Sequence, residues 1–182
     1  MQRFFVPTIS GDLGDAVTVA TEGLLHQLQN VLRVKPGDRV ILLDNSGFEW
    51  EASLSSIEKT SAVFMLHSKK LNENEPEISV TLFQALPKKM ELFELVLQKG
   101  TEIGVKKFVP LISERTERRH SGNIARLHRI LKEAAEQSNR GIIPALENPR
   151  EFQEIIKNLS GASFLFDVNG KPFLKNEEKS IN

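Results

Sequence analysis

Three arginines lie close together between residues 114 and 120: Arg115, Arg118 and Arg119. They follow an apolar run that ends near Ile112 and is typical of a buried strand. Because loops at the carboxyl ends of strands line the ligand crevice of an open parallel sheet, this position favours recognition. A guanidinium binds phosphate as a bidentate fork and stacks on bases, so the pattern indicates RNA. The alternative is a solvated loop whose arginines pair with the two glutamates of the same stretch.

Charge is unevenly distributed along the chain. Its 182 residues carry 24 basic and 24 acidic side chains, for a formal net charge of zero. Residues 88–140 hold 12 Lys or Arg and 7 Asp or Glu, whereas residues 1–87 hold 7 and 11 and residues 141–182 hold 5 and 6. A local basic excess is typical of a protein with a polyanionic partner. Charge alone does not separate this interpretation from a solvated helix face.

Composition excludes several classes of protein. The chain has no cysteine, so a disulfide-stapled fold, a thiolate nucleophile and a Cys-ligated metal are impossible. No signal-peptide core follows Met1 and no window approaches the length of a membrane-spanning helix, so we expect a cytoplasmic protein. The histidines have no metal-like spacing with carboxylates, and we expect no metal site at His26, His67, His120 or His128.

Short apolar runs separated by turn residues dominate residues 1–70. The run from Phe48 to Ile57 alternates apolar and polar residues, which is typical of a strand with one buried face. Together these runs predict a small β-barrel, followed by a polar linker at residues 71–76. The predicted strands are Arg3–Val6, Ala16–Thr21, Arg39–Asp44, Phe48–Ile57 and Ala62–Leu66, and the predicted helix is Glu22–Leu32.

Strands alternate with helices in residues 77–182, which indicates a mostly parallel α/β sheet covered on both faces. Ser121 is the expected N-cap of one helix, and Gly104 is expected to end another. The predicted strands are Ile78–Leu86, Phe108–Ile112 and Ser163–Phe166, and the predicted helices are Lys89–Ile103, Asn123–Ser138 and Glu151–Leu159.

Several longer strings are specific when they occur together and in this order. They are RFFV at Arg3–Val6, HQLQNVLRVKPGD at His26–Asp38, TLFQALPKKMELFELVLQKGTEIGV at Thr81–Val105, PLISERT at Pro110–Thr116 and EAAEQSNRGIIP at Glu133–Pro144. In these strings the sequence resembles the RsmE-type 16S ribosomal RNA uridine-N3 methyltransferases. The resemblance extends over nearly the whole chain.

The resemblance implies a PUA-like RNA-binding barrel at residues 1–70 and a SPOUT methyltransferase domain, a knotted α/β fold, at residues 77–182. It also implies that a homodimer transfers a methyl group from S-adenosylmethionine to N3 of one uridine in small-subunit 16S rRNA, a step in ribosome biogenesis. Because the N3 proton must leave during the attack, such a site needs a base or water, and positioning. The catalytic base is not assigned.

Site residues follow from the resemblance and from the arginine-rich stretch. Glu102 is expected to orient Lys99 or Arg115 rather than to act as the base. The expected RNA-binding residues are Arg3, Arg33, Lys88, Arg115, Arg118, Arg119, Gln137 and Arg140.

The sequence departs from the family at its end. The family holds its cofactor in a knot marked by a GPEGG-type loop, which is absent before the final Ser180-Ile181-Asn182. We therefore expect no cofactor-binding residues in this chain, weak binding of S-adenosylmethionine and a compromised dimer interface. Two alternatives remain: a non-catalytic rRNA-binding fragment, or a chain that folds only in its barrel and is rapidly proteolysed beyond Glu77.

Overall fold

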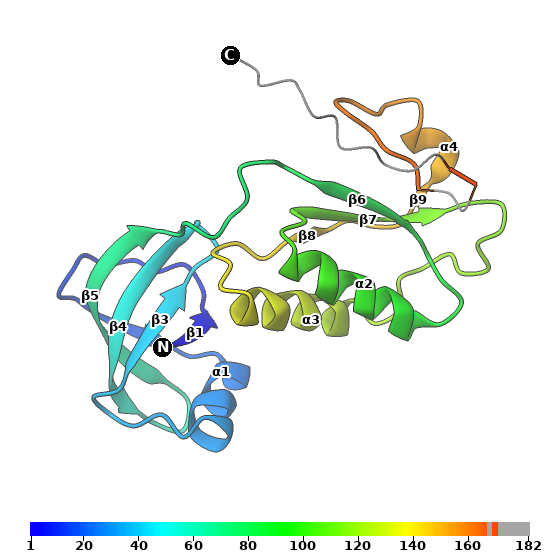
Figure 1. Cartoon of the computed structure of the whole chain (residues 1–182). Coiled ribbons are helices and arrows are strands. Elements are labelled where there is room, and N and C mark those ends of the chain that lie inside the picture. The colour runs from blue at the N-terminus through cyan, green and yellow to red at the C-terminus, as the bar shows by residue number, and fades with distance from the viewer. Residues whose placement is uncertain (167–168, 171–182) are drawn as a thin grey trace, which may run out of the picture.

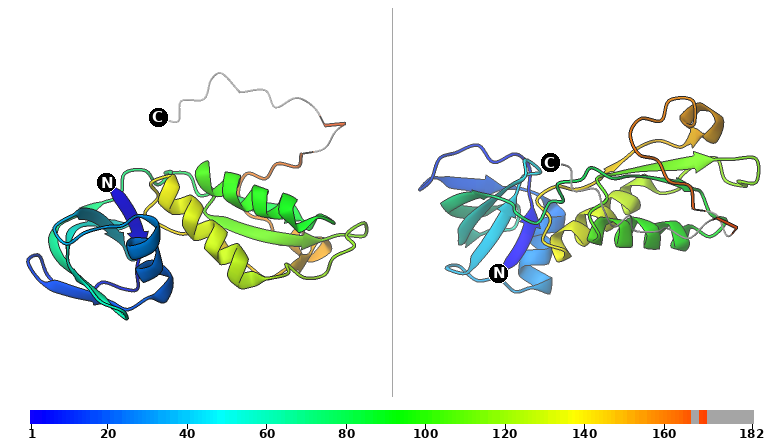
Figure 2. Two further views of the ribbon diagram at one scale, coloured as in Figure 1. Left: turned by 90° about the horizontal axis from the view of Figure 1, so that it is seen from below. Right: turned by 45° about the horizontal axis from the view of Figure 1, so that its top comes forward.

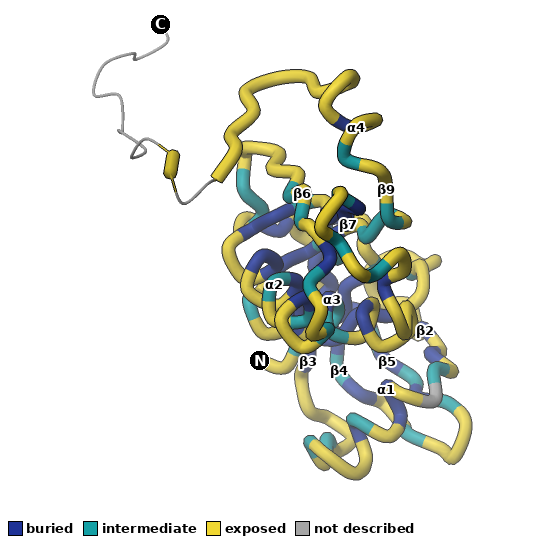
Figure 3. The backbone as a smooth tube through the Cα atoms, turned by 90° about the vertical axis from the view of Figure 1, so that its right-hand side faces the viewer, coloured by how far each residue is buried: buried dark blue, intermediate teal, exposed yellow. Residues whose placement is uncertain are grey.

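The computed structural model describes residues 1–166 and 169–170, which form two sheets joined by residues 72–80 (Figure 1). Figure 3 shows buried segments in both parts of the chain, whereas residues 156–166 are exposed. Within the described ranges, no helix is long and apolar enough to cross a lipid bilayer.

The first sheet has five strands in the order β1-β3-β4-β5-β2 and curls around its own core (Figure 1). Only β1 and β3 pair in parallel. The alternating pattern of β4 buries Trp50, Ala52 and Leu54 against Leu28 of the helical segment. The strands are β1 Gln2–Phe5, β2 Ala16–Val19, β3 Arg39–Leu43, β4 Phe48–Ile57 and β5 Ala62–Leu71.

The predicted helix Glu22–Leu32 forms, but in two parts. An α-helix, α1 (Glu22–His26), continues into a π-helical turn, η1 (Gln27–Val31). Arg33 then adopts a φ of 53°, in the left-handed region that non-glycine residues rarely occupy. The wider π turn and this residue redirect the chain toward β3, which a continuous α-helix does not do.

The second sheet is parallel throughout. Its order is β6-β7-β8, with β9 also paired to β7. Two parallel helices cover one face, while α4 lies on the other (Figures 1 and 2). The elements are β6 Thr81–Ala85, α2 Met90–Glu102, β7 Lys107–Ile112, α3 Ile124–Gln137, β8 Ala145–Leu146, β9 Arg150–Glu151 and α4 Phe152–Ile155.

Strand β7 carries the core of this sheet because its alternate side chains point to opposite faces. Phe108 packs with Leu97 of α2 and Leu127 of α3, whereas Val109 packs with Ile155 of α4. Residues beyond the first sheet therefore have a packed core of their own.

Gly104 ends α2 as predicted. Its φ of +98° suits the left-handed residue after a helix, and the Val105 N–H donates to the Gly100 carbonyl at 2.9 Å. A Cβ at Gly104 would also lie 2.3 Å from Cγ of Pro76, so the position has no room for a side chain.

Three local predictions are wrong. Ser163–Phe166 is not a strand, and the side chains of Phe164, Leu165 and Phe166 are 64%, 82% and 85% exposed. An apolar run forms a strand only where a neighbouring strand accepts its backbone hydrogen bonds. The helix predicted at Glu151–Leu159 is confined to α4, since Glu151 belongs to β9.

The third concerns the start of α3. Asn123 is the N-cap, and its Oδ1 accepts a hydrogen bond from the Arg126 N–H at 3.0 Å. Ser121 is buried, and its Oγ has no hydrogen-bond partner. Gly122 adopts a φ of +75° between them and turns the chain, so only Asn123 is in register with the first helical turn.

Candidate nucleic-acid interface

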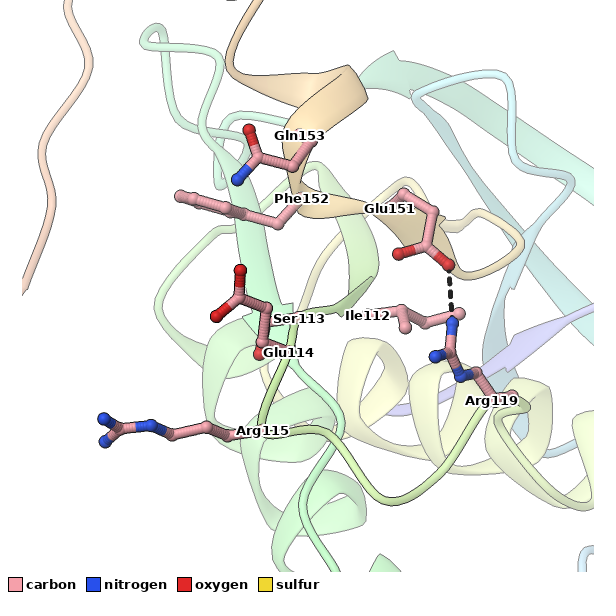
Figure 4. A pocket seen from close by; sticks show the side chains of 8 residues that line it. All are labelled: Ile112, Ser113, Glu114, Arg115, Arg119, Glu151, Phe152 and Gln153. Carbon is pink, nitrogen blue, oxygen red and sulfur yellow. Dashed lines mark hydrogen bonds and ion pairs between the residues drawn. The ribbon is translucent and has the colours of Figure 1, made fainter.

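A hollow of about 450 Å³ lies at the carboxyl ends of β7 and β9 (Figure 4). This is the edge at which open parallel sheets bind ligands. Four of its eight lining residues are charged. The lining comprises Ile112, Ser113, Glu114, Arg115, Arg119, Glu151, Phe152 and Gln153.

A tight turn directly after β7 presents Arg115. The Thr116 N–H donates to the Ser113 carbonyl at 2.9 Å, and the Ser113 N–H donates to Thr116 Oγ1 at 3.0 Å. These bonds close the turn and leave Glu114 and Arg115 exposed at its tip. Arg115 makes no ion pair with any residue of the described part of the chain, and Figure 4 shows it extending away from Arg119.

Three other cations of this edge, Arg119, Arg118 and Lys88, already have partners. Arg119 Nη1 lies 2.8 Å from Glu151 Oε1, and Arg118 Nε donates to the Lys88 carbonyl at 2.8 Å. Lys88 Nζ lies 3.2 Å from Glu117 Oε2. All these ion-pairing groups are well exposed, so the pairs contribute little to stability and exchange readily with other ligands. Pairing of the loop arginines with the loop glutamates, as the alternative required, does not occur.

Two helix N-termini reinforce the positive charge of this edge. Because α2 and α3 each return the chain from a carboxyl end of the parallel sheet, both begin here. The helix dipole places partial positive charge at each start, and Lys89 precedes α2 without a side-chain cap. The Arg126 guanidinium joins the helices through two hydrogen bonds to Glu94, at 2.5 and 2.8 Å.

The structure separates the remaining predicted residues from this edge. Glu102 and Gln137 lie at the C-terminal ends of α2 and α3, at the opposite edge of the sheet. Glu102 pairs with Lys99 at 2.9 Å, so it does not orient Arg115. Arg33 is exposed on the first domain.

Arg140 and Arg3, which were predicted to bind RNA, are both enclosed by protein groups in this structure. The Arg140 side chain is 2% exposed, and the Arg3 side chain is 16% exposed and lies 2.6 Å from the buried carboxylate of Glu49. Burial raises the pKa of Glu49, but Arg3 and Lys70 outweigh it and the pKa is lowered. Both arginines are occupied by protein acceptors and have little surface for a ligand.

Sequence reasoning missed Glu151, Phe152 and Gln153 of the hollow. Their position follows from the pairing of β9 with β7, and a two-residue strand has no recognisable pattern. It also missed Glu75, which lies in the segment interpreted as a linker. A single carboxylate in a polar run carries no signal for burial.

Comparison with known proteins assigns the chain to a family. A model described as "RNA methyltransferase domain" matches residues 73–181, and one described as "RNA methyltransferase PUA domain" matches residues 26–64. The chain belongs to the RNA methyltransferase family defined by these domains. The predicted fold class, a PUA domain followed by a mostly parallel α/β sheet, is thereby confirmed.

Individual relatives agree with this assignment. "Ribosomal RNA small subunit methyltransferase E" of Synechocystis sp. is 37% identical over 152 residues, covering 83% of this chain and 49% of the relative. The Bacillus subtilis protein of that name is 33% identical over 166 residues, covering 87% and 64%. The chain thus spans about half to two thirds of these relatives.

A solved structure shows the same fold. It is the "Ribosomal RNA small subunit methyltransferase E from Neisseria gonorrhoeae bound to S-adenosyl methionine", which superposes with a TM-score of 0.79 and 30% identity. The match covers 88% of this chain and 66% of that chain.

Proposed function

We propose that this protein takes part in S-adenosylmethionine-dependent methylation of ribosomal RNA, and that the carboxyl edge of the second sheet contacts the RNA. The carrying observation is the match of residues 73–181 to an RNA methyltransferase domain directly after a PUA domain. The exposed, unpaired Arg115 and two helix N-termini at one edge support an anionic ligand there.

The finer specificity rests on the relatives. Their shared name refers to the small ribosomal subunit, and the resemblance of the sequence specifies N3 of a uridine in 16S rRNA and a homodimer. We extend both to this protein, and a ribosomal substrate places the reaction in the cytoplasm. When bound, S-adenosylmethionine would supply its sulfonium methyl group and leave as S-adenosylhomocysteine, while the N3 proton would pass to a base or water.

The hollow by itself does not fit the cofactor. An adenosyl group needs several large apolar side chains around it, whereas four of the eight residues that line this hollow are charged and only Ile112 and Phe152 are large and apolar. We therefore derive no step of the methyl transfer from them. The prediction that this chain holds no cofactor-binding residues remains a prediction.

A methylation assay tests the proposal. Small ribosomal subunits that lack the modification are incubated with the protein and S-adenosylmethionine carrying a labelled methyl group, and the labelled nucleotide is identified by mass spectrometry. Catalysis by this chain predicts label at N3 of one uridine, whereas a chain without cofactor-binding residues predicts RNA binding with no label. Label at another nucleotide refutes the uridine assignment, and no label together with no RNA binding refutes the function.

A second candidate is RNA binding without catalysis, which the free Arg115 favours. It predicts no label, but an affinity for 16S rRNA that falls steeply with salt. Replacing Arg118 and Arg119 together by Ala should flatten that dependence because two phosphate contacts are lost. An unchanged slope refutes a role for these two arginines.

A further inference from the structure

The segment that connects the two domains is bound to the chain leaving α3. Arg140, at the end of this chain, donates to both carboxylate oxygens of Glu75, with Nε–Oε1 at 3.2 Å and Nη2–Oε2 at 2.8 Å. Its Nη1 donates to the carbonyls of Thr101 at 3.2 Å and Val105 at 2.7 Å. The planar guanidinium reaches all four acceptors with separate N–H groups, and the single ammonium of a lysine cannot match this geometry.

Backbone groups complete the same contact. Glu75 Oε1 also accepts from the N–H groups of Gly141 at 3.0 Å and Ile142 at 3.1 Å. The side chain of Asn72 donates to the Asn139 carbonyl at 2.9 Å and to the buried Glu49 of the first sheet at 2.7 Å. The connecting residues are therefore held from both sides.

A third set of contacts joins the first sheet directly to α3 and the chain after it. The Phe5 N–H donates to Glu136 Oε1 at 2.9 Å, and the Ile143 N–H donates to Asn45 Oδ1 at 2.7 Å. Beside these bonds lies a cluster of buried apolar residues from both domains: Phe5, Ile41, Leu43 and Ala135, with Ile143 packed against it. We call residues 72–75 and 139–143, with Phe5 and Glu136, the joint.

We propose that the joint fixes the orientation of the two domains so that one RNA contacts both, and that Glu75 and Arg140 are positioning residues for RNA recognition. The role in recognition rests on the proposed function, whereas the fixed orientation does not. Domains joined by a flexible linker move relative to one another unless the interface between them is large and apolar. Here buried ion-pair, backbone and apolar contacts restrict the motion of one domain relative to the other.

The location of the joint gives this orientation a consequence. Helix α3 runs from the arginine-rich edge to the joint, and its 14 residues span about 21 Å. An RNA that contacts both Arg115 and Arg33 must therefore reach across the joint. Once the RNA is bound to one domain, its binding to the second domain is intramolecular. The effective concentration for this second step depends on a fixed orientation of the two domains.

Substitution of Gly141 disturbs the contacts of the joint without changing any charge. A Cβ at this position would lie 2.7 Å from Cβ and 3.0 Å from Cγ of Asn72, so Gly141→Ala forces the two segments apart. Gly23 is the matched control, because a Cβ there meets no atom within 4 Å. Neither glycine has a positive φ, so neither substitution places an alanine in the left-handed region.

Spin labels on two introduced cysteines test the relative orientation of the domains. Because the chain has no native cysteine, the labels attach only at those two positions. Lys59→Cys and His128→Cys place labels at exposed positions on the two domains. We expect a narrow inter-label distance distribution in this parent and in Gly23→Ala. In Gly141→Ala and Arg140→Lys it should broaden or shift while far-ultraviolet circular dichroism stays native. Unchanged distributions in both joint variants overturn the proposal.

RNA binding tests whether the fixed orientation matters for recognition. The readout is the difference between a long and a short RNA, which general destabilisation of the protein does not produce. For a 16S rRNA transcript, we expect affinity to fall by about 10- to 100-fold in Gly141→Ala and Arg140→Lys. A four-nucleotide RNA, too short to span the joint, should bind all variants equally. A broadened distance distribution with unchanged transcript affinity overturns the positioning role. Absence of transcript binding by the parent refutes the proposed function but leaves the label experiment decisive for the orientation.

Discussion

At the scale of single residues, burial and pairing separate arginines that are alike in sequence. Arg115 has no ion-pair partner among the described residues and lies at the tip of a turn, whereas Arg119 is held by Glu151 and Arg140 is enclosed with Glu75. A guanidinium with exposed donors can exchange water for phosphate, whereas one that is 2% exposed must first break buried contacts. Accessibility therefore decides which of these cations is available to an anionic ligand.

Replacing Arg115 by Ala should weaken RNA binding and flatten its salt dependence. Each phosphate contact with single-stranded RNA contributes about 0.7 to the slope of log affinity against log salt, so we expect a loss of about that size. Filter binding of a 16S rRNA fragment across a salt series measures it. Lys59→Ala, an exposed cation on the first domain, is the control. Equal effects of both substitutions would show a diffuse charge effect.

The buried carboxyl group of Glu136 is expected to make the folded state less stable as pH rises. Burial raises its pKa above 4.5, and the Phe5 N–H and Lys132 only partly oppose this. The folded state thus binds the proton more tightly than the unfolded state, and this contribution to stability is lost as pH rises through the folded pKa. Glu136→Gln should be more stable than the parent at pH 7 and lose the advantage near pH 4. Urea unfolding at both pH values decides, and a constant difference contradicts the prediction.

Among the helices and strands, some boundaries are set by a local cap and others by pairing with a distant element. Asn123 caps α3 by its own side chain, so the start of this helix is a local property. Strand β9 and helix α4 exist because β7 offers a hydrogen-bonding edge and an apolar face. The apolar run Ser163–Phe166 is exposed and does not form a strand.

The cap of α3 gives a direct test. Asn123→Ala removes the acceptor of the Arg126 N–H and should lower the free energy of unfolding by about 1 kcal/mol. Ser121→Ala is the matched control, because its Oγ is buried without a hydrogen-bond partner and its removal leaves no group unsatisfied. Chemical denaturation measures both. A larger loss in Ser121→Ala would restore Ser121 as the cap.

At the scale of the whole molecule, the joint makes the two domains one unit. Glu75, Arg140 and Asn72 are distant in sequence, yet they meet where the connection passes α3. Removing one member of a buried ion pair costs about 3–5 kcal/mol, because the other charge is left without compensation. The domains should therefore separate when the joint is broken, before either core unfolds.

Acid should weaken the joint. Burial raises the pKa of Glu75, but the Arg140 guanidinium and the N–H groups of Ile142 and Gly141 outweigh it, and the pKa lies below 4.5. This contribution to stability is present above pH 4.5 and is lost as pH falls through the folded pKa. The inter-label distance distribution should broaden below pH 4 in the parent. In Glu75→Gln it should already be broad at pH 7, and a narrow distribution in that variant contradicts the assignment.

The sequence by itself determined the order and type of most elements, because period-2 and helical apolar patterns and residues such as Gly104 act over a few neighbours. It also located the arginine-rich turn after β7, since a loop at a strand's carboxyl end follows from the α/β alternation. The tertiary structure was needed to show that Arg140 is enclosed by Glu75, while Arg115 has no ion-pair partner among the described residues. It also shows that Asn72 and Glu75 of the predicted linker at residues 71–76 are bound to the chain after α3. The physical reason is that burial and ion pairing depend on contacts between residues far apart in the chain, and composition does not record those contacts.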